Sequence, residues 1–278
     1  MMSQGRPRSI CALCGFMLAV AAHVCAAGPP LLNAHAHNDY LHERPLLDAI
    51  DHGFTSVEAD VYLIDGELLV AHTRPELDPE RTLRRLYLDP LRQKVRQGRG
   101  RVWPGGPTLT LLVDVKADGK ASYQALAKLL AEYDDMISVV RDGRLETKAV
   151  TVIVSGDRAR ETIAADEPRH VGIDGRLSDL DSSAPSNLLP LISDNWTLHF
   201  RWRGEGPMPA AERAKLLDIV HRAHDRGRRV RFWATPDNPA LWRELIAAKI
   251  DLINTDDLAG LERFLRDSKL NDQTEAKE

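Results

Sequence analysis

Four short polar clusters in this chain carry side chains that can hold a cation and transfer protons, and each adjoins a run of apolar residues. They are Asn33–Tyr40 (Asn-Ala-His-Ala-His-Asn-Asp-Tyr), Glu58-Ala59-Asp60, His72 after the apolar run Leu68–Ala71, and Asp114-Val115-Lys116. A single cluster of this kind is more often structural than catalytic. Their function therefore depends on whether the fold brings all four clusters together.

The carboxylates of the second and fourth clusters have the spacing of a metal site. Residues two apart on a strand point to the same face, so Glu58 and Asp60 would lie side by side and repel each other unless neutralised. Together with Asp114 they form a set of hard oxygen ligands suited to Mg²⁺ or Ca²⁺. We expect one divalent cation at these three residues. Lys116 could add a positive charge beside a phosphoryl oxygen or form a salt bridge with Asp114.

The histidines supply proton chemistry. His37 and His72 could flank a phosphorus atom, one taking a proton or attacking and the other protonating the leaving oxygen. His35 shares a face with His37 on a regular strand, where it could support the site from behind, bind metal or simply pack. Asn38 and Asp39 could contact the phosphate or cap their loop. Trp233 could line the pocket or pack in the core, and Thr255-Asp256 could add a hydrogen bond nearby.

Short apolar runs alternate with amphipathic stretches along the chain, which predicts a (β/α)₈ barrel in a single domain over residues 28–278. A doubly wound open sheet is the alternative, although no Gly-rich loop follows the first strand. In a barrel the polar clusters, each at the end of a strand, would meet at one mouth. The predicted strands are Leu31–His37, Ser56–Leu63 with Leu68–His72, Leu109–Lys116, Ala149–Val154, Val171–Asp174, Leu188–Ile192, Val230–Ala234 and Leu252–Asp256. The predicted helices are Pro45–His52, Leu83–Gln97, Tyr123–Glu132, Asp157–Ala165, which Asp157 would cap, Ala211–Asp225 and Pro239–Ala248.

With these residues the chain resembles the phosphatidylinositol-specific phospholipase C-like phosphodiesterase superfamily, which includes glycerophosphodiester phosphodiesterases. The shared pattern is a His, a Glu-x-Asp, an acidic turn and a second His, here His37, Glu58-Ala59-Asp60, Asp65-Gly66 and Val70-Ala71-His72. The opening His35–Tyr40 and Asp174–Leu177 are similar to the altered inheritance of mitochondria protein 6 type branch.

The resemblance implies that His37 and His72 are the catalytic pair of a metal-dependent phosphodiesterase. It implies metal binding by Glu58, Asp60 and Asp114, with Lys116 and Trp233 lining the pocket. Asn38 stands where glycerophosphodiester phosphodiesterases usually carry an arginine. A small or lipid-like phosphodiester is therefore the expected substrate, without a defined head group.

Two other functions fit parts of the sequence. His35-x-His37 could hold zinc in an amidohydrolase or phosphatase-type barrel, but that needs further histidines at later strand ends. Those ends carry Ser155, Asp174, Asp194, Thr235 and Asp256 instead. A barrel that binds a phosphate ligand without catalysis is the second alternative.

The first 27 residues have the features of a secretory signal. Arg6 and Arg8 precede an apolar run, Ile10–Val24, that ends on small residues and is shorter than the roughly 20 residues of a membrane span. We expect cleavage of residues 1–27 and a periplasmic or secreted protein that is monomeric and has no integral membrane segment in its mature chain. All three cysteines lie in this segment, so the remainder has no disulfide. Its charge balance of 35 − 41 = −6, without basic runs, argues against nucleic acid as a partner.

Overall fold

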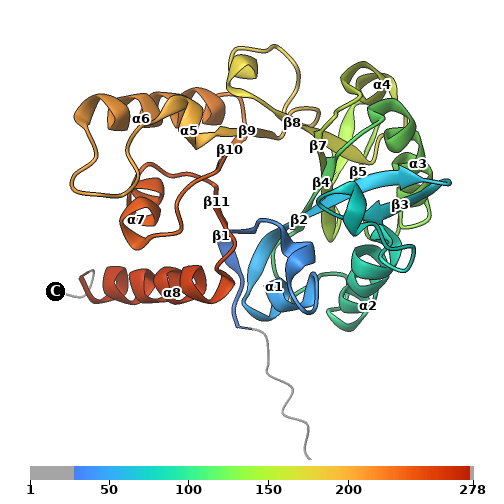
Figure 1. The fold of residues 1–278 in the computed structure, drawn as a ribbon, viewed down its shortest axis with the longest axis horizontal. Coiled ribbons are helices and arrows are strands. Elements are labelled where there is room, and N and C mark those ends of the chain that lie inside the picture. Colours follow the sequence, from blue (N-terminus) through green and yellow to red (C-terminus); the bar gives the residue numbers. More distant parts are fainter. Residues whose placement is uncertain (1–27, 276–278) are drawn as a thin grey trace, which may run out of the picture.

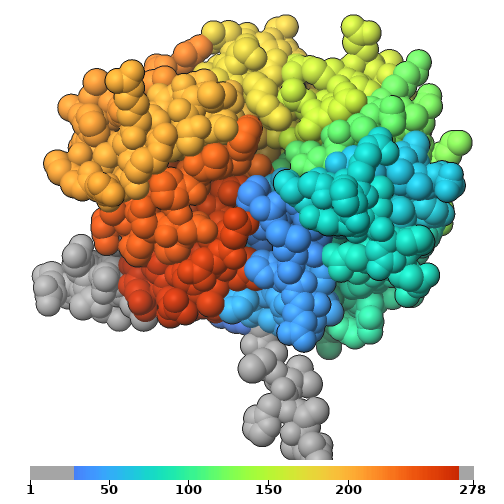
Figure 2. Space-filling model, viewed as in Figure 1, coloured from blue at the N-terminus to red at the C-terminus, as the bar shows by residue number. Residues whose placement is uncertain are grey.

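Eight parallel strands close into a barrel in the computed structural model, which describes residues 28–275 (Figure 1). β1 pairs with both β2 and β11, so the ring has no open edge. Figure 2 shows the same junction on the surface, with the first described residues in blue against the C-terminal residues in red. The predicted (β/α)₈ barrel is confirmed, and the doubly wound alternative is wrong. The barrel strands are β1 (Leu31–Ala36), β2 (Phe54–Ile64), β4 (Leu109–Val115), β7 (Val150–Gly156), β8 (Val171–Gly175), β9 (Leu191–Asn195), β10 (Arg229–Trp233) and β11 (Leu252–Thr255).

The barrel is plugged by apolar side chains directly beneath its polar mouth. Leu112, Ile153, Leu191 and Leu252 are buried against one another inside the ring. Each stands two positions before a polar residue of the mouth, so strand alternation places one layer under the other. The larger apolar cluster lies between the strands and the helices. The barrel interior is therefore a packed core that supports a polar upper layer.

A hairpin returns the chain to the mouth after β2. β3 (Glu67–Val70) pairs antiparallel with the end of β2, with Val61 opposite Val70. The turn residues Asp65 and Gly66 have positive φ values of 50° and 87°, as a two-residue turn of type I′ requires. The next residue after the strand, Ala71, donates its N–H to the carbonyl of Asp60 at 3.2 Å. His72 consequently arrives beside Asp60.

The helices surround the barrel largely as predicted. They are α1 (Leu47–Asp51), α2 (Asp89–Gln97), α3 (Gly119–Ala131), α4 (Arg160–Ala165), α6 (Ala210–His224), α7 (Pro239–Ala247) and α8 (Leu258–Glu275). A π-helix (Arg84–Leu88) precedes α2. The sequence did not predict α5 (Trp196–His199), α8 or the hairpin of β5 (Val139–Arg141) and β6 (Arg144–Glu146).

The predicted cap of α4 is wrong. The Asp157 carboxylate instead accepts the N–H of Gly119 at 2.8 Å, at the start of α3. This contact ties the loop after β7 to the helix that follows β4.

None of the helices within residues 28–275 is long and apolar enough to cross a membrane. The predicted signal segment, residues 1–27, lies outside the described residues.

Candidate functional site

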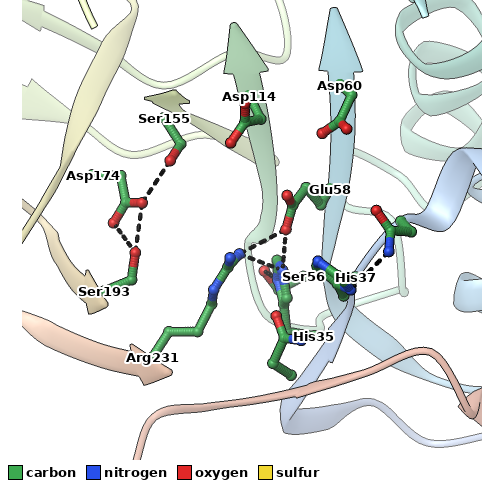
Figure 3. Close-up of polar contacts among 12 residues, drawn as sticks. His35, His37, Ser56, Glu58, Asp60, Asp114, Ser155, Asp174, Ser193 and Arg231 are labelled. Atoms are coloured by element: carbon green, nitrogen blue, oxygen red, sulfur yellow. Dashed lines mark hydrogen bonds and ion pairs between the residues drawn. The ribbon is translucent and has the colours of Figure 1, made fainter. Parts of the chain in front are cut away.

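The three carboxylates predicted to bind metal meet at the mouth of the barrel (Figure 3). Glu58 and Asp60 project from β2, and the sheet register places Asp114 of β4 directly beside Asp60. One oxygen from each carboxylate lies within 4.8 Å of the other two. Glu58 and Asp60 are buried and Asp114 is partly buried. Strand alternation alone therefore builds this cluster from residues of two neighbouring strands.

The donor set fits a divalent cation. Asp60 Oδ2 lies 2.8 Å from Lys116 Nζ, whereas its buried Oδ1 has no hydrogen-bond partner among the described residues. Lys116 also reaches Asp114 at 3.2 Å. Burial raises the pKa of Asp114 to about 6, and Lys116 only partly opposes this effect because Glu58 and Asp60 add repulsion. An unbonded oxygen in a crowd of carboxylates is what a hard cation such as Mg²⁺ or Ca²⁺ would satisfy.

Glu58 is held by a buried arginine that the sequence analysis did not single out. Arg231 Nη1 lies 2.8 Å from Glu58 Oε2, and both side chains are about 5% exposed or less. Although burial favours the neutral acid, the charge of Arg231 outweighs it and holds the pKa of Glu58 well below its usual range. The signal in the sequence was Arg229-Val-Arg231-Phe-Trp233, where arginines alternate with apolar residues in a strand of a closed barrel.

His35 supports this ion pair from inside the barrel. Its Nε2 accepts from Arg231 Nη1 at 2.7 Å, so the proton resides on Nδ1 and is donated to Ser56 Oγ at 2.7 Å. The ring is fully buried, and burial together with Arg231 lowers its pKa to about 3. His35 is therefore neutral, and its free lone pair is already used. This geometry contradicts a role for His35 as a zinc ligand, and with it the zinc-hydrolase alternative.

Each of the two predicted catalytic histidines is oriented by a carboxylate at Nδ1. His37 Nδ1 lies 2.8 Å from Asp256 Oδ1, and His72 Nδ1 lies 2.9 Å from Asp60 Oδ2. Both rings therefore present Nε2 to a ligand, the arrangement in which a carboxylate fixes the tautomer of a catalytic imidazole. Burial opposes protonation of His37, but the hydrogen bond to Asp256 and the charge of Glu58 outweigh it, so the pKa of His37 is raised.

Asn38 and Tyr40 connect the two histidines. Asn38 adopts a left-handed conformation with φ of 48° and donates to Asp256 Oδ1 at 3.3 Å. Its Oδ1 accepts the Tyr40 hydroxyl at 2.7 Å, and that hydroxyl lies 3.0 Å from His72 Nδ1. The Tyr40 oxygen also lies 2.6 Å from Asp60 Oδ2, so its single proton can be donated either to Asn38 or to Asp60. Tyr40 was missed as a site residue because a tyrosine after a polar cluster is indistinguishable from a core residue in sequence.

Asp39 does not face the mouth, and its predicted contact with substrate is wrong. Its side chain is fully buried, and Oδ2 accepts the N–H of Leu46 at 2.6 Å and the hydroxyl of Tyr87 at 2.9 Å. Burial raises the pKa of Asp39 to about 7. Trp233 is partly exposed at the end of β10, so its predicted place in the pocket wall stays a prediction.

Comparisons with known proteins point to one group. Residues 28–101 match the family model of the AIM6-like phosphodiesterase domain, and residues 229–259 match that of the glycerophosphoryl diester phosphodiesterase family. The chain is 30% identical to altered inheritance of mitochondria protein 6 of Eremothecium gossypii, over 85% of this chain and 70% of that protein. It is 27% identical to the homolog in Arthroderma benhamiae, over 81% of each chain.

Among solved structures, the chain is similar to a protein described as a glycerophosphodiester phosphodiesterase from Parabacteroides distasonis. The identity is 16% and the TM-score 0.49, with 87% of this chain and 100% of the other covered. The two family-model matches contain His37, Glu58, Asp60 and His72 in the first segment and Arg231 in the second.

Proposed function

The chain belongs to the altered inheritance of mitochondria protein 6 family, a branch of the phospholipase C-like phosphodiesterases, and we propose that it hydrolyses a phosphodiester at the barrel mouth. The observation that carries the proposal is the pair of histidines, His37 and His72, whose Nδ1 atoms are held by carboxylates beside a cluster of three acidic side chains. Neither a core nor a surface needs such an arrangement of oriented imidazoles and crowded carboxylates.

Glu58, Asp60 and Asp114 would hold one Mg²⁺ or Ca²⁺, which supplies positive charge that binds and polarises a phosphoryl oxygen. Lys116 adds a second positive charge at the same place. Nε2 of one histidine takes a proton from the attacking oxygen, and Nε2 of the other gives a proton to the leaving oxygen. Arg231 keeps Glu58 ionised and pointing to the mouth. The substrate is a small or lipid-like phosphodiester.

The test is turnover of bis-p-nitrophenyl phosphate and of lysophospholipids, after metal removal and after addition of Mg²⁺ or Ca²⁺. We expect His37→Asn and His72→Asn each to lower kcat by roughly 100-fold or more, the usual contribution of a general acid or base. His221→Asn is the matched control, because that ring is 76% exposed on α6. Absence of turnover with every substrate and metal, or equal rates for all three variants, would overturn the proposal.

A non-catalytic phosphate-binding barrel is the remaining alternative, and the same samples separate the two. Tight binding of a phosphodiester without hydrolysis over days would favour it. A metal-dependent rate that disappears in the two histidine variants excludes it.

We also propose that residues 1–27 direct export and are removed, leaving a periplasmic or secreted enzyme. The apolar run Ile10–Val24 supports this, since it is preceded by Arg6 and Arg8 and followed by Ala26-Ala27. Cell fractionation with mass spectrometry of the N-terminus tests it: a full-length chain retained in the cytoplasm would refute it.

A further inference from the structure

A second polar cluster continues around the barrel mouth from the three carboxylates, at the ends of β7, β8 and β9. Its centre is Asp174, which is 1% exposed. Asp174 accepts the hydroxyls of Ser155 at 2.7 Å and Ser193 at 2.5 Å, and Arg176 donates to its Oδ2 at 2.9 Å. Figure 3 shows Asp174 with both serines, separated from Glu58 and His37. The carboxylate is thus saturated, and Arg176 balances its charge.

A second arginine stands beside this balanced group. Arg158 follows β7 and donates to the backbone carbonyl of Asp174 at 2.5 Å, but it forms no ion pair with any described residue. Its Nε is buried without a hydrogen-bond partner in residues 28–275. Burial, and then the nearby charge of Arg176, lower the pKa of Arg158. The two carboxylates that attract Arg158, Asp174 and Asp179, are already paired, with Arg176 and Arg160 respectively. These three arginines therefore face two carboxylates, which leaves one positive charge in excess.

Two other arginines show what a purely structural role looks like: Arg228, which is buried and whose Nε also has no partner within residues 28–275, and Arg160, whose side chain is 40% exposed. Arg228 donates to four backbone carbonyls, and Arg160 forms a two-bond pair with Asp179 at 2.9 Å for both contacts. Arg158 has neither arrangement. Placing like charges together with unused donors costs free energy that an anionic ligand recovers, and the loops at this end of a barrel are where ligands bind.

We propose that Arg158 and Arg176 bind a second anionic group of the substrate, a carboxylate or phosphate monoester on the alcohol substituent. The proposal rests on the proposed hydrolysis of a phosphodiester at Glu58, Asp60 and Asp114. The register pairs Asp114 with Ser155, and Arg176 Nη2 lies 3.5 Å from the Ser155 hydroxyl. Ser155 lies on β7, next to β4, and Asp174 lies on β8, one strand further on. With neighbouring strands about 4.8 Å apart, a substituent of a few bonds spans this distance of one to two strands.

Glycerophosphoserine and glycerophosphoethanolamine test this inference, because the two diesters differ by one carboxylate. We expect the wild type to prefer glycerophosphoserine in kcat/KM by roughly 10-fold or more, the value of a charge-assisted hydrogen-bonded pair. Arg158→Gln should bring the ratio close to one, and Arg158→Lys should keep an intermediate ratio. Arg201→Gln is the control for net charge and should keep the wild-type ratio, since Arg201 is exposed and its side chain has no hydrogen-bond partner among residues 28–275.

Calorimetric binding of phosphoserine and phosphoethanolamine separates failure of the inference from failure of the proposed function. Turnover of both diesters with a ratio near one in the wild type, or an unchanged ratio in Arg158→Gln, would overturn the anionic subsite and leave the hydrolase intact. No turnover, with phosphoserine still bound roughly 10-fold more tightly in the wild type but not in Arg158→Gln, would overturn the hydrolase and support the subsite. Thermal melts establish that the variants are folded before either comparison.

Discussion

Removing the guanidinium group of Arg231 should reveal how strongly the stability of the site depends on a positive charge next to Glu58. In Arg231→Met the apolar stem is kept and the charge is lost, so Glu58 stays buried without the partner that lies 2.8 Å away. At this distance the attraction between the two charges is about 6 kcal/mol at an effective dielectric constant of about 20. Part of it offsets the cost of burying both ions, and breaking buried pairs usually destabilises proteins by about 3–5 kcal/mol.

For a chain of this size that loss corresponds to a melting temperature lower by roughly 10 °C. The assay is thermal unfolding near neutral pH of the metal-free protein, followed by addition of Mg²⁺ or Ca²⁺. We expect a larger metal-induced rise in melting temperature for Arg231→Met than for the wild type, because the cation then compensates Glu58. Arg229→Met is the matched control: it lies two positions earlier on β10 and its side chain bonds to Thr110 at 3.1 Å.

The double variant Glu58→Gln/Arg231→Met supplies the refutation. Replacing both partners leaves no unpaired charge, so it should recover most of the stability lost in Arg231→Met. If the single variant costs less than about 1 kcal/mol, or the double variant is no more stable than the single one, the ion pair does not hold Glu58 as argued.

Three further changes test other parts of the site. Asp256→Asn should lower the pKa of His37, because the hydrogen bond and the charge of Asp256 raise it, and should shift the limb of the pH–rate profile that belongs to His37 toward acid. An unmoved profile would exclude His37 from proton transfer. Gly156→Ala places a Cβ 2.5 Å from the Asp114 carboxylate at a φ of +69°, so calorimetry should show at least roughly 10-fold weaker metal binding, and wild-type affinity would contradict it. Burial raises the pKa of Asp39 from 3.8 to about 7, so its ionisation lowers stability as pH rises through this window, by up to about 4 kcal/mol. Asp39→Asn should remove this loss of stability with rising pH, and urea unfolding at about pH 5 and about pH 9 measures it. If the free energies of unfolding of the variant and the wild type differ by the same amount at both pH values, the pKa of Asp39 is not raised.

The barrel and the metal cluster could be predicted because both follow from local periodicity. Alternation along β2 places Glu58 and Asp60 on one face, and the end of the next barrel strand brings Asp114 beside them. The acidic turn at Asp65-Gly66 indicated the hairpin that returns His72 to the mouth. In each case the relevant neighbours lie within one strand or in adjacent strands.

Contacts across the ring could not be predicted in this way. Arg231 of β10 meets Glu58 of β2, 173 positions away in the chain, and this contact depends on barrel closure and strand register together. Asp39 fails for a different reason. The left-handed turn at Asn38 directs Asp39 inward to Tyr87, so its position after a catalytic histidine did not indicate its direction.

The charges at the mouth explain why a divalent ion and a diester suit each other here. Glu58, Asp60 and Asp114 contribute three negative charges when ionised, and Arg231 and Lys116 contribute two positive ones. The cluster alone is therefore negative and would repel any phosphate. A monovalent cation would only neutralise it, whereas a divalent cation leaves one net positive charge, which matches the single negative charge of a phosphodiester. A second anionic group on the substrate would find no balance at this cluster, whereas the excess positive charge of Arg158 lies after β7, the strand next to Asp114, where such a group would extend.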